Sequence, residues 1–176
     1  AYTYKSPGKI IFGTPPPPPR GPDNTQLKRI AGALDNAGIP NEIPEDINRT
    51  LWWKFMINVG INQSSAVLRA PYGVFQSSAR ARELMTRLME EVICLARARS
   101  VDLTRADLDE WIRILHTLSP DGKTSMLQDM EAGRKTEIEI FAGAVTAMGK
   151  ESGIPTPVNR TFLNLIQVME NPGHDS

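Results

Sequence analysis

Apolar residues recur every three to four positions over most of the chain, which is the period of an amphipathic α-helix. The longest such run lies from Glu45 to about Ala70, where Ile47, Leu51, Phe55 and Val59 follow one another at intervals of four. The same period predicts further helices over residues 78–99, 104–118, 125–133, 136–153 and 157–169. The pattern therefore predicts a mainly α body.

The first 45 residues have a different pattern. YTYKS and KIIFG are short and rich in aromatic and β-branched residues, which favours strands, and Pro15–Pro19 predicts an extended loop. NTQLKRIAGALDNAG then predicts a helix ending at Gly38, and IPNEI a short strand. This order indicates the end of an α/β domain. We therefore expect residues 1–45 to be the terminal strands and helix of a truncated domain, and residues 46–176 to be a helical domain.

Charge and composition narrow the possible partners. The 176 residues carry 20 basic and 20 acidic side chains, so no net field favours nucleic acid or an anionic membrane. No apolar run approaches the ~20 residues of a membrane span. Cys94 is the only cysteine, and we interpret it as a small core residue in a reducing, cytoplasmic setting. The chain begins with Ala1 on a strand-like segment, which suggests a piece of a longer protein.

A polar face interrupts the long predicted helix. Lys54, Asn58 and Asn62 are spaced by four residues, so they share one side of the helix. Their sequence neighbours are mostly apolar, so we expect this face to be buried, where unpaired polar groups are costly. The three side chains could bind a polar ligand, with Lys54 as general acid or anion clamp. The alternative is a surface lysine whose stem lies along apolar neighbours.

A second polar segment, TSMLQDMEAGRKTEIE, brings several functional groups close together in the sequence. Ser125, Asp129, Arg134 and Glu137 supply a hydroxyl, two carboxylates and a guanidinium within thirteen residues. Glu137 could complement Lys54 by accepting a hydrogen bond from a substrate hydroxyl. For Asp129 and Arg134 we favour a structural role that ties the loop to its helices. A solvated charged turn is the alternative interpretation.

Several common site types are absent from the sequence. The two histidines, His116 and His174, have no cysteine or carboxylate at ligand spacing, so we expect no metal site. The chain has no Gly-x-Gly-x-x-Gly, no P-loop and no nucleophile elbow. It therefore lacks a dinucleotide-binding loop of its own.

These segments together resemble the C-terminal domain of the ketopantoate reductases, the NADPH-dependent 2-dehydropantoate 2-reductases of pantothenate biosynthesis. The resemblance covers about residues 50–165 and rests on five motifs in the family's order: Trp53-Lys54; Asn58 and Asn62; Thr124-Ser125-Met126-Leu127-Gln128-Asp129; Gly133-Arg134-x-Thr136-Glu137-Ile138; and Gly153-Ile154-x-Thr156-Pro157-x-Asn159. Each motif is weak alone, and their joint order and spacing are specific.

The resemblance implies a helical domain of the 6-phosphogluconate-dehydrogenase-like type, preceded by a Rossmann domain that binds NADPH. Residues 1–45 resemble the last strands and helix of that Rossmann domain, whose cofactor-binding half would lie before Ala1. On this view the fragment alone is inactive. A small-molecule 2-keto acid is the expected substrate, and a homodimer is a possible assembly.

The resemblance also implies roles for particular residues. Lys54 matches the lysine that protonates the alkoxide formed when hydride reaches the ketone carbon. Asn58 and Asn62 match positions that orient the lysine and bind a substrate hydroxyl. Ser125 matches a contact to the substrate carboxylate, and Glu137 an acid that binds hydroxyls of substrate and cofactor.

Two positions depart from the family pattern and keep alternatives open. The family often has asparagine where this chain has Tyr72 and Gly122. The substrate could therefore be ketopantoate or another 2-keto acid. A helical dimerisation or interaction module without catalytic activity is the alternative from a different functional class.

Overall fold

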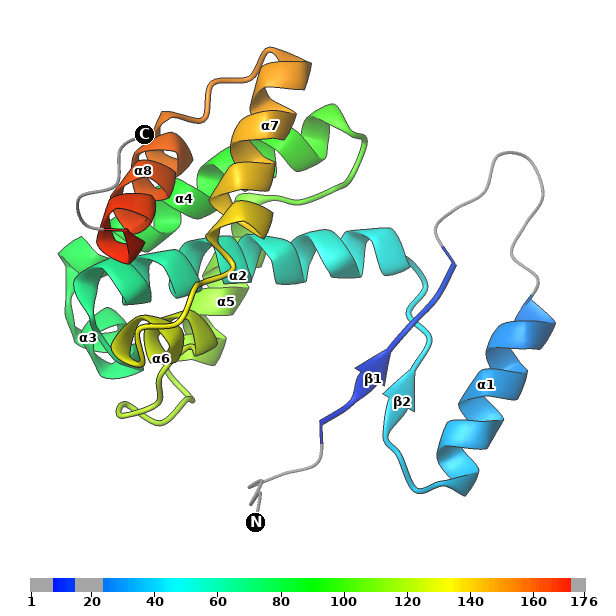
Figure 1. Cartoon of the computed structure of the whole chain (residues 1–176). Helices are drawn as coiled ribbons and strands as arrows, with labels where there is room; N and C mark the ends of the chain where they lie inside the picture. Colours follow the sequence, from blue (N-terminus) through cyan, green and yellow to red (C-terminus); the bar gives the residue numbers. More distant parts are fainter. Residues whose placement is uncertain (1–7, 15–23, 172–176) are drawn as a thin grey trace. The chain divides into compact units, whose positions relative to one another are not determined.

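The computed structural model describes residues 8–14 and 24–171 (Figure 1). It divides into two compact units, Ala1–Leu51 and Trp52–Ser176. The expected YTYKS strand, the proline loop and the end of the C-terminal tail lie outside the described residues.

The first unit contains a parallel strand pair joined through a helix. Strand β1 (Ile10–Ile11) pairs with β2 (Asn41–Glu42), and α1 (Asn24–Asn36) lies between them in the sequence. Parallel neighbours require such a crossover connection. Gly38 ends the helical segment as expected, with φ +68°, a conformation that glycine adopts without steric cost. The strand–helix–strand order predicted from the sequence is therefore present.

The second unit is helical. The helix α2 (Ile47–Leu68) begins in the first unit and continues into the second. It is followed by α3 (Tyr72–Ser77), α4 (Ala79–Ala98), α5 (Arg105–Leu115), α6 (Ser125–Glu131), the 3₁₀ helix η1 (Ile138–Ile140), α7 (Ala142–Ser152) and α8 (Pro157–Glu170). The predicted mainly α fold is confirmed.

Polar residues begin several of these helices. The hydroxyl oxygens of Ser78 and Thr124 accept hydrogen bonds from the backbone N–H groups of Ala81 and Leu127. The Asp107 carboxylate accepts the backbone N–H of Thr104 at 2.8 Å. Such caps satisfy backbone groups that a helix leaves unpaired at its ends, so these starts follow from local sequence.

The core of the second unit forms around α4, which contacts α3, α5, α7 and α8. Its side chains Met85, Leu88, Met89 and Val92 are completely buried. The helix α2 packs on α4 at Gly60, where an added Cβ would overlap the Met89 side chain. This close approach fixes α2 against the core and so positions its polar face.

Three sequence-based expectations are wrong in detail. Residues 136–153 do not form one helix, because Phe141 (φ −103°, ψ −90°) separates η1 from α7. Helix α3 was not expected, since its six residues are too few to show a period. Cys94 is exposed and is not a core residue, because it lies on the outer side of α4.

The described residues contain neither a helix suited to a membrane nor a cluster of metal-ligating side chains. None of their helices combines the length and the apolar character needed to cross a bilayer. Over the same residues, no three side chains of His, Cys, Asp or Glu lie together as metal ligands would.

Candidate active site

The polar face of α2 changes from exposed to buried along the helix. Lys54 is exposed, Asn58 is half-buried and Asn62 is 8% exposed. Residues at i and i+4 on a helix have Cβ atoms about 5–6 Å apart, so the three side chains form one continuous row. No hydrogen bond or ion pair of these side chains occurs among the described residues. The row is therefore available to a ligand.

The expectation that Lys54 is buried is wrong. The core side of this part of α2 is formed by Met56, Ile57 and Val59, and Lys54 lies on the other side of the helix. Trp52 and Phe55 are half-buried next to it and meet edge to face at 6.0 Å. Asn62, in contrast, is buried as expected. The chain thus presents an ammonium group at the surface and an amide deeper in the same face.

Ser125 is the first residue of α6, and its own side chain is exposed. Its position depends on its neighbours. Thr124, buried, caps the helix, and Met126 and Leu127 enter the core. Buried residues on both sides fix the backbone at Ser125, so its hydroxyl is presented to solvent from a well-anchored turn.

Glu137 is held in a similar way, immediately before η1. The backbone N–H of Thr136 donates to the Glu170 carboxylate at 2.6 Å, and the Thr136 hydroxyl accepts the N–H of Ile138. Ile138 is completely buried. The Glu137 carboxylate between them is exposed and has no partner among the described residues.

The five predicted side chains all belong to the second unit, but no direct bond joins any two of them in the described part of the chain. They come from three segments: α2, the start of α6 and the start of η1. The expected structural role of Asp129 and Arg134 is confirmed, because Arg134 donates to Asp129 Oδ1 at 2.6 and 2.8 Å. This pair closes the turn between α6 and η1.

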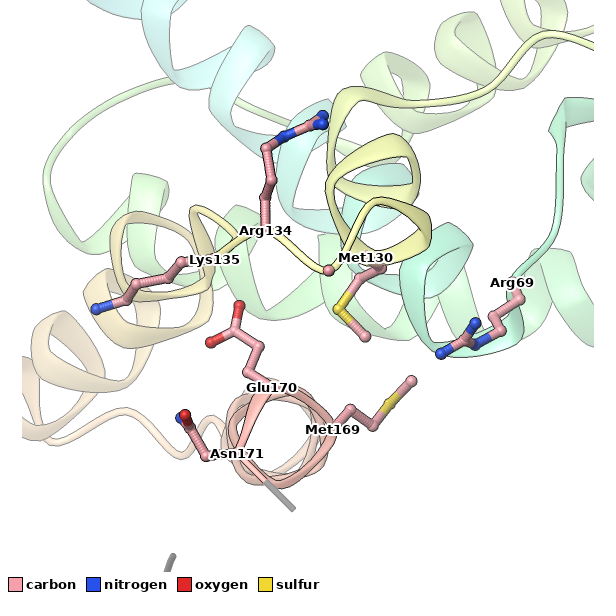
Figure 2. A pocket seen from close by; sticks show the side chains of 8 residues that line it. Arg69, Met130, Arg134, Lys135, Met169, Glu170 and Asn171 are labelled. Atoms are coloured by element: carbon pink, nitrogen blue, oxygen red, sulfur yellow. The ribbon is translucent and has the colours of Figure 1, made fainter.

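A pocket of about 350 Å³ lies near the end of α8 (Figure 2). It is lined by Arg69, Met130, Gly133, Arg134, Lys135, Met169, Glu170 and Asn171. Figure 2 shows that the Arg134 guanidinium points away from α8. Arg69 follows the end of α2, about 20 Å along the helix from Lys54 at 1.5 Å per residue. None of the five predicted residues lines this pocket, so it is separate from the Lys54 end of the face.

Comparison with known proteins decides the family. Residues 46–170 match the family model described as ketopantoate reductase PanE/ApbA C terminal. The chain belongs to the ketopantoate reductase family. The match covers all five predicted site residues and most of the second unit.

Members of the ketopantoate reductase family resemble this chain in both sequence and fold. The chain is 34% identical over 145 residues to the 2-dehydropantoate 2-reductase of Pyrobaculum aerophilum, covering 82% of this chain and 52% of that protein. A crystal structure of a PanE/ApbA family ketopantoate reductase from Ralstonia eutropha is 28% identical, with TM-score 0.80, over 96% of this chain and 53% of that one.

A dimeric ketopantoate reductase from Staphylococcus aureus shares the fold at 20% identity, with TM-score 0.76 over 85% of this chain and 52% of that chain. The chain therefore spans about half the length of the relatives it matches.

The last motif of the ketopantoate reductase pattern has a structural role that sequence reasoning missed. Asn159 is completely buried; its Nδ2 donates to Glu91 Oε2 at 2.7 Å and its Oδ1 accepts from Gln63 Nε2 at 3.2 Å. The Glu91 carboxylate also accepts the backbone N–H groups of Val158 and Asn159, at the start of α8. A carboxylate at a helix N-terminus is stabilised by the helix dipole. Asn159 therefore joins α2, α4 and α8.

Proposed function

We propose that this chain is the C-terminal part of an NADPH-dependent 2-dehydropantoate 2-reductase, which converts ketopantoate to pantoate. The observation that carries the proposal is the row Lys54, Asn58 and Asn62, because its polar groups have no intramolecular partner although Asn62 is buried. The amide and ammonium groups of the row keep their donors and acceptors free on a face that deepens toward the core, so a polar ligand can pair with them there.

The chemistry assigned to this chain is proton donation and substrate orientation. When bound, the reduced nicotinamide supplies the hydride that converts the ketone carbon to an alkoxide carbon. Lys54 Nζ then gives its proton to the alkoxide oxygen, which completes the alcohol. A positioned ammonium also stabilises the negative charge as it forms, and general acid catalysis of this kind contributes about 10²–10⁴-fold to a rate.

The remaining site residues bind and orient. The amides of Asn58 and Asn62 have both donors and acceptors for a substrate hydroxyl and for Lys54. The Ser125 hydroxyl donates to the substrate carboxylate. The Glu137 carboxylate accepts hydrogen bonds from hydroxyl groups of substrate and cofactor. It is exposed and has no partner among the described residues, which fits that role.

We place the cofactor mainly on a preceding Rossmann domain. The chain has no glycine-rich phosphate loop, so Glu137 is the single cofactor contact assigned to it. Residues 1–45 are the last strands and helix of that domain in this proposal. The parallel β1 and β2 around α1 support it, as does the exposure of Ile10 and Ile11, which further strands would cover.

A homodimer in the cytoplasm completes the proposal. Its support is the fold shared with a dimeric ketopantoate reductase. Sedimentation equilibrium of the full-length protein at several concentrations tests the dimer, and a monomer mass throughout would contradict it.

A reductase for another 2-keto acid is the second candidate, because Tyr72 and Gly122 stand where the family often has asparagine. The deciding experiment is NADPH oxidation by the full-length gene product with ketopantoate and a panel of 2-keto acids. Preference for ketopantoate supports the first candidate, and preference for another acid supports the second. No turnover with any of them would contradict both and favour a non-catalytic helical module.

A further inference from the structure

The two positions that depart from the family pattern touch each other. A Cβ added to Gly122 would lie 2.8 Å from Cδ2 and 3.1 Å from Cε2 of the Tyr72 ring, and 3.0 Å from the Ser119 carbonyl oxygen. Contacts below 3.0 Å are not tolerated without movement, so the tyrosine ring makes the tightest contact in the space that a side chain at position 122 would need, and the Ser119 carbonyl limits that space further. The two departures are therefore one coupled change.

Backbone hydrogen bonds join the same two segments. The N–H of Tyr72 donates to the Gly122 carbonyl at 2.9 Å, and the N–H of Gly73 donates to the Pro120 carbonyl at 2.8 Å. Gln76 Nε2 donates to the carbonyls of Leu115 and Leu118, both at 2.9 Å. Helix α3 thus holds the connection between α5 and α6 at Leu118, Pro120 and Gly122.

This connection leads directly to a candidate substrate contact. Gly122 donates its N–H to the Ser119 carbonyl at 2.9 Å to close a turn, and Thr124 caps α6 two residues later. Ser125 is the next residue. The turn is therefore continuous with the start of α6, where Ser125 lies.

We propose that Tyr72 is a positioning residue whose ring, packed in the space beside Gly122, sets the place of the 119–124 turn and thereby of Ser125. The proposal deepens the proposed function and rests on it only for the claim that Ser125 binds the keto-acid carboxylate. The positioning of the turn by the Tyr72 ring does not depend on what Ser125 binds.

The ring, and not the hydroxyl, carries this role. The contacting atoms are ring carbons, and Tyr72 packs against the hydrophobic core as a half-buried residue. Burial raises the pKa of the Tyr72 phenol above its ordinary value of 10.0, so the side chain stays uncharged near neutral pH. Its hydroxyl makes no hydrogen bond among the described residues.

Hydrogen exchange of the whole protein tests the positioning without any assay of activity. The amides of Gly122 and Leu127 report on the turn and on the α6 cap. In Tyr72→Asn we expect both to exchange about tenfold faster, whereas Tyr72→Phe keeps wild-type protection because the ring remains. Equal exchange in the two variants and the wild type would overturn the proposal.

The coupling is tested with Gly122→Ala in two backgrounds. We expect Gly122→Ala to speed exchange strongly beside Tyr72 and less in Tyr72→Asn, where the Ser119 carbonyl still limits the new methyl group but the ring does not. Equal effects in both backgrounds would overturn the coupling. Gly32→Ala is the control, since its Cβ meets nothing within 4 Å.

Steady-state kinetics of the full-length reductase test the consequence for substrate. Tyr72→Ala, which removes the ring without adding a polar group, should raise KM for the 2-keto acid about tenfold with kcat changed less than twofold, as expected for lost uniform binding, and Tyr72→Phe should keep the wild-type KM. Loss of thermal stability with unchanged KM would overturn the link to substrate. If the wild type reduces no 2-keto acid, the proposed function fails, while hydrogen exchange still decides whether Tyr72 positions the turn.

Discussion

The two units differ in how completely they bury their apolar side chains. In the second unit, residues such as Met85, Leu88 and Leu127 are completely buried. In the described part of the first unit, Leu27 and Ile47 are buried, but five isoleucines are 37% to 49% exposed: Ile10, Ile11, Ile30, Ile39 and Ile43. The second unit also exposes apolar side chains such as Leu84, Ile140 and Val168, but it holds nearly all of the completely buried ones. Burial of apolar area is the main favourable term in folding, so we expect the second unit to be the more stable of the two.

This difference in burial also explains why the candidate site residues belong to the second unit. Asn62, Ser125 and Glu137 each lie next to completely or nearly completely buried residues of the second unit, which fix their backbones. A catalytic side chain must be held within a fraction of an ångström, and a packed scaffold provides this. The first unit has no comparable support among its described residues.

The largest effect expected from this comparison is on catalysis. Lys54→Ala in the full-length protein should lower kcat about 10²–10⁴-fold, because it removes the proposed proton donor. Thermal unfolding should hardly change, since Lys54 is exposed and makes no bond among the described residues. Lys150→Ala, another exposed lysine on a helix, is the control and should keep wild-type turnover. Turnover within twofold of wild type in Lys54→Ala would exclude Lys54 as the acid.

Core truncation measures the difference in burial directly. Leu88→Ala should lower the free energy of unfolding by about 3 kcal/mol, because it leaves a cavity in the second unit. In the 176-residue chain, Leu84→Ala, one turn earlier on α4 at 40% exposure, and Ile10→Ala, at 44%, should each cost less than about 1 kcal/mol. Chemical denaturation of the three variants gives the values. A cost for Ile10→Ala equal to that of Leu88→Ala would mean that the first unit depends on its isoleucines as strongly as the core does.

The buried polar network within the second unit should give an intermediate effect. Asn159→Ala should cost about 2 kcal/mol of unfolding free energy, since it removes hydrogen bonds from the buried Gln63 and from the Glu91 carboxylate. Asn164→Ala, an exposed asparagine on the same helix, is the control. Equal denaturation midpoints for the two variants would show that the network does not hold α2, α4 and α8 together.

The smallest effects are expected from two glycines of the first unit. Gly38→Ala forces a Cβ into a left-handed conformation and should cost about 1 kcal/mol. Gly32→Ala, inside α1 with open space around it, should gain about 0.5–1 kcal/mol from helix propensity. Local hydrogen exchange of α1 measures both changes. Changes in stability of opposite sign in the two variants support an α1 that folds as described, and changes of the same sign would contradict it.

The sequence by itself determined most of the helices, most of their boundaries and the family. These depend on local information: periodicity selects the residues that share a face, and Thr104, Thr124 and Gly38 mark helix ends through their own backbone chemistry. The row Lys54, Asn58 and Asn62 was likewise predictable, because a spacing of four places residues on one face wherever the helix lies.

Only the tertiary structure decided which side chains are buried and which distant residues touch. Lys54 and Cys94 were expected to be buried and are exposed, while the break at Phe141, the contact of Tyr72 with Gly122 and the Asn159 network were not expected. The physical reason is that burial and close contact join residues far apart in the chain. Asn159 lies 96 residues from Gln63, and no local pattern records that separation.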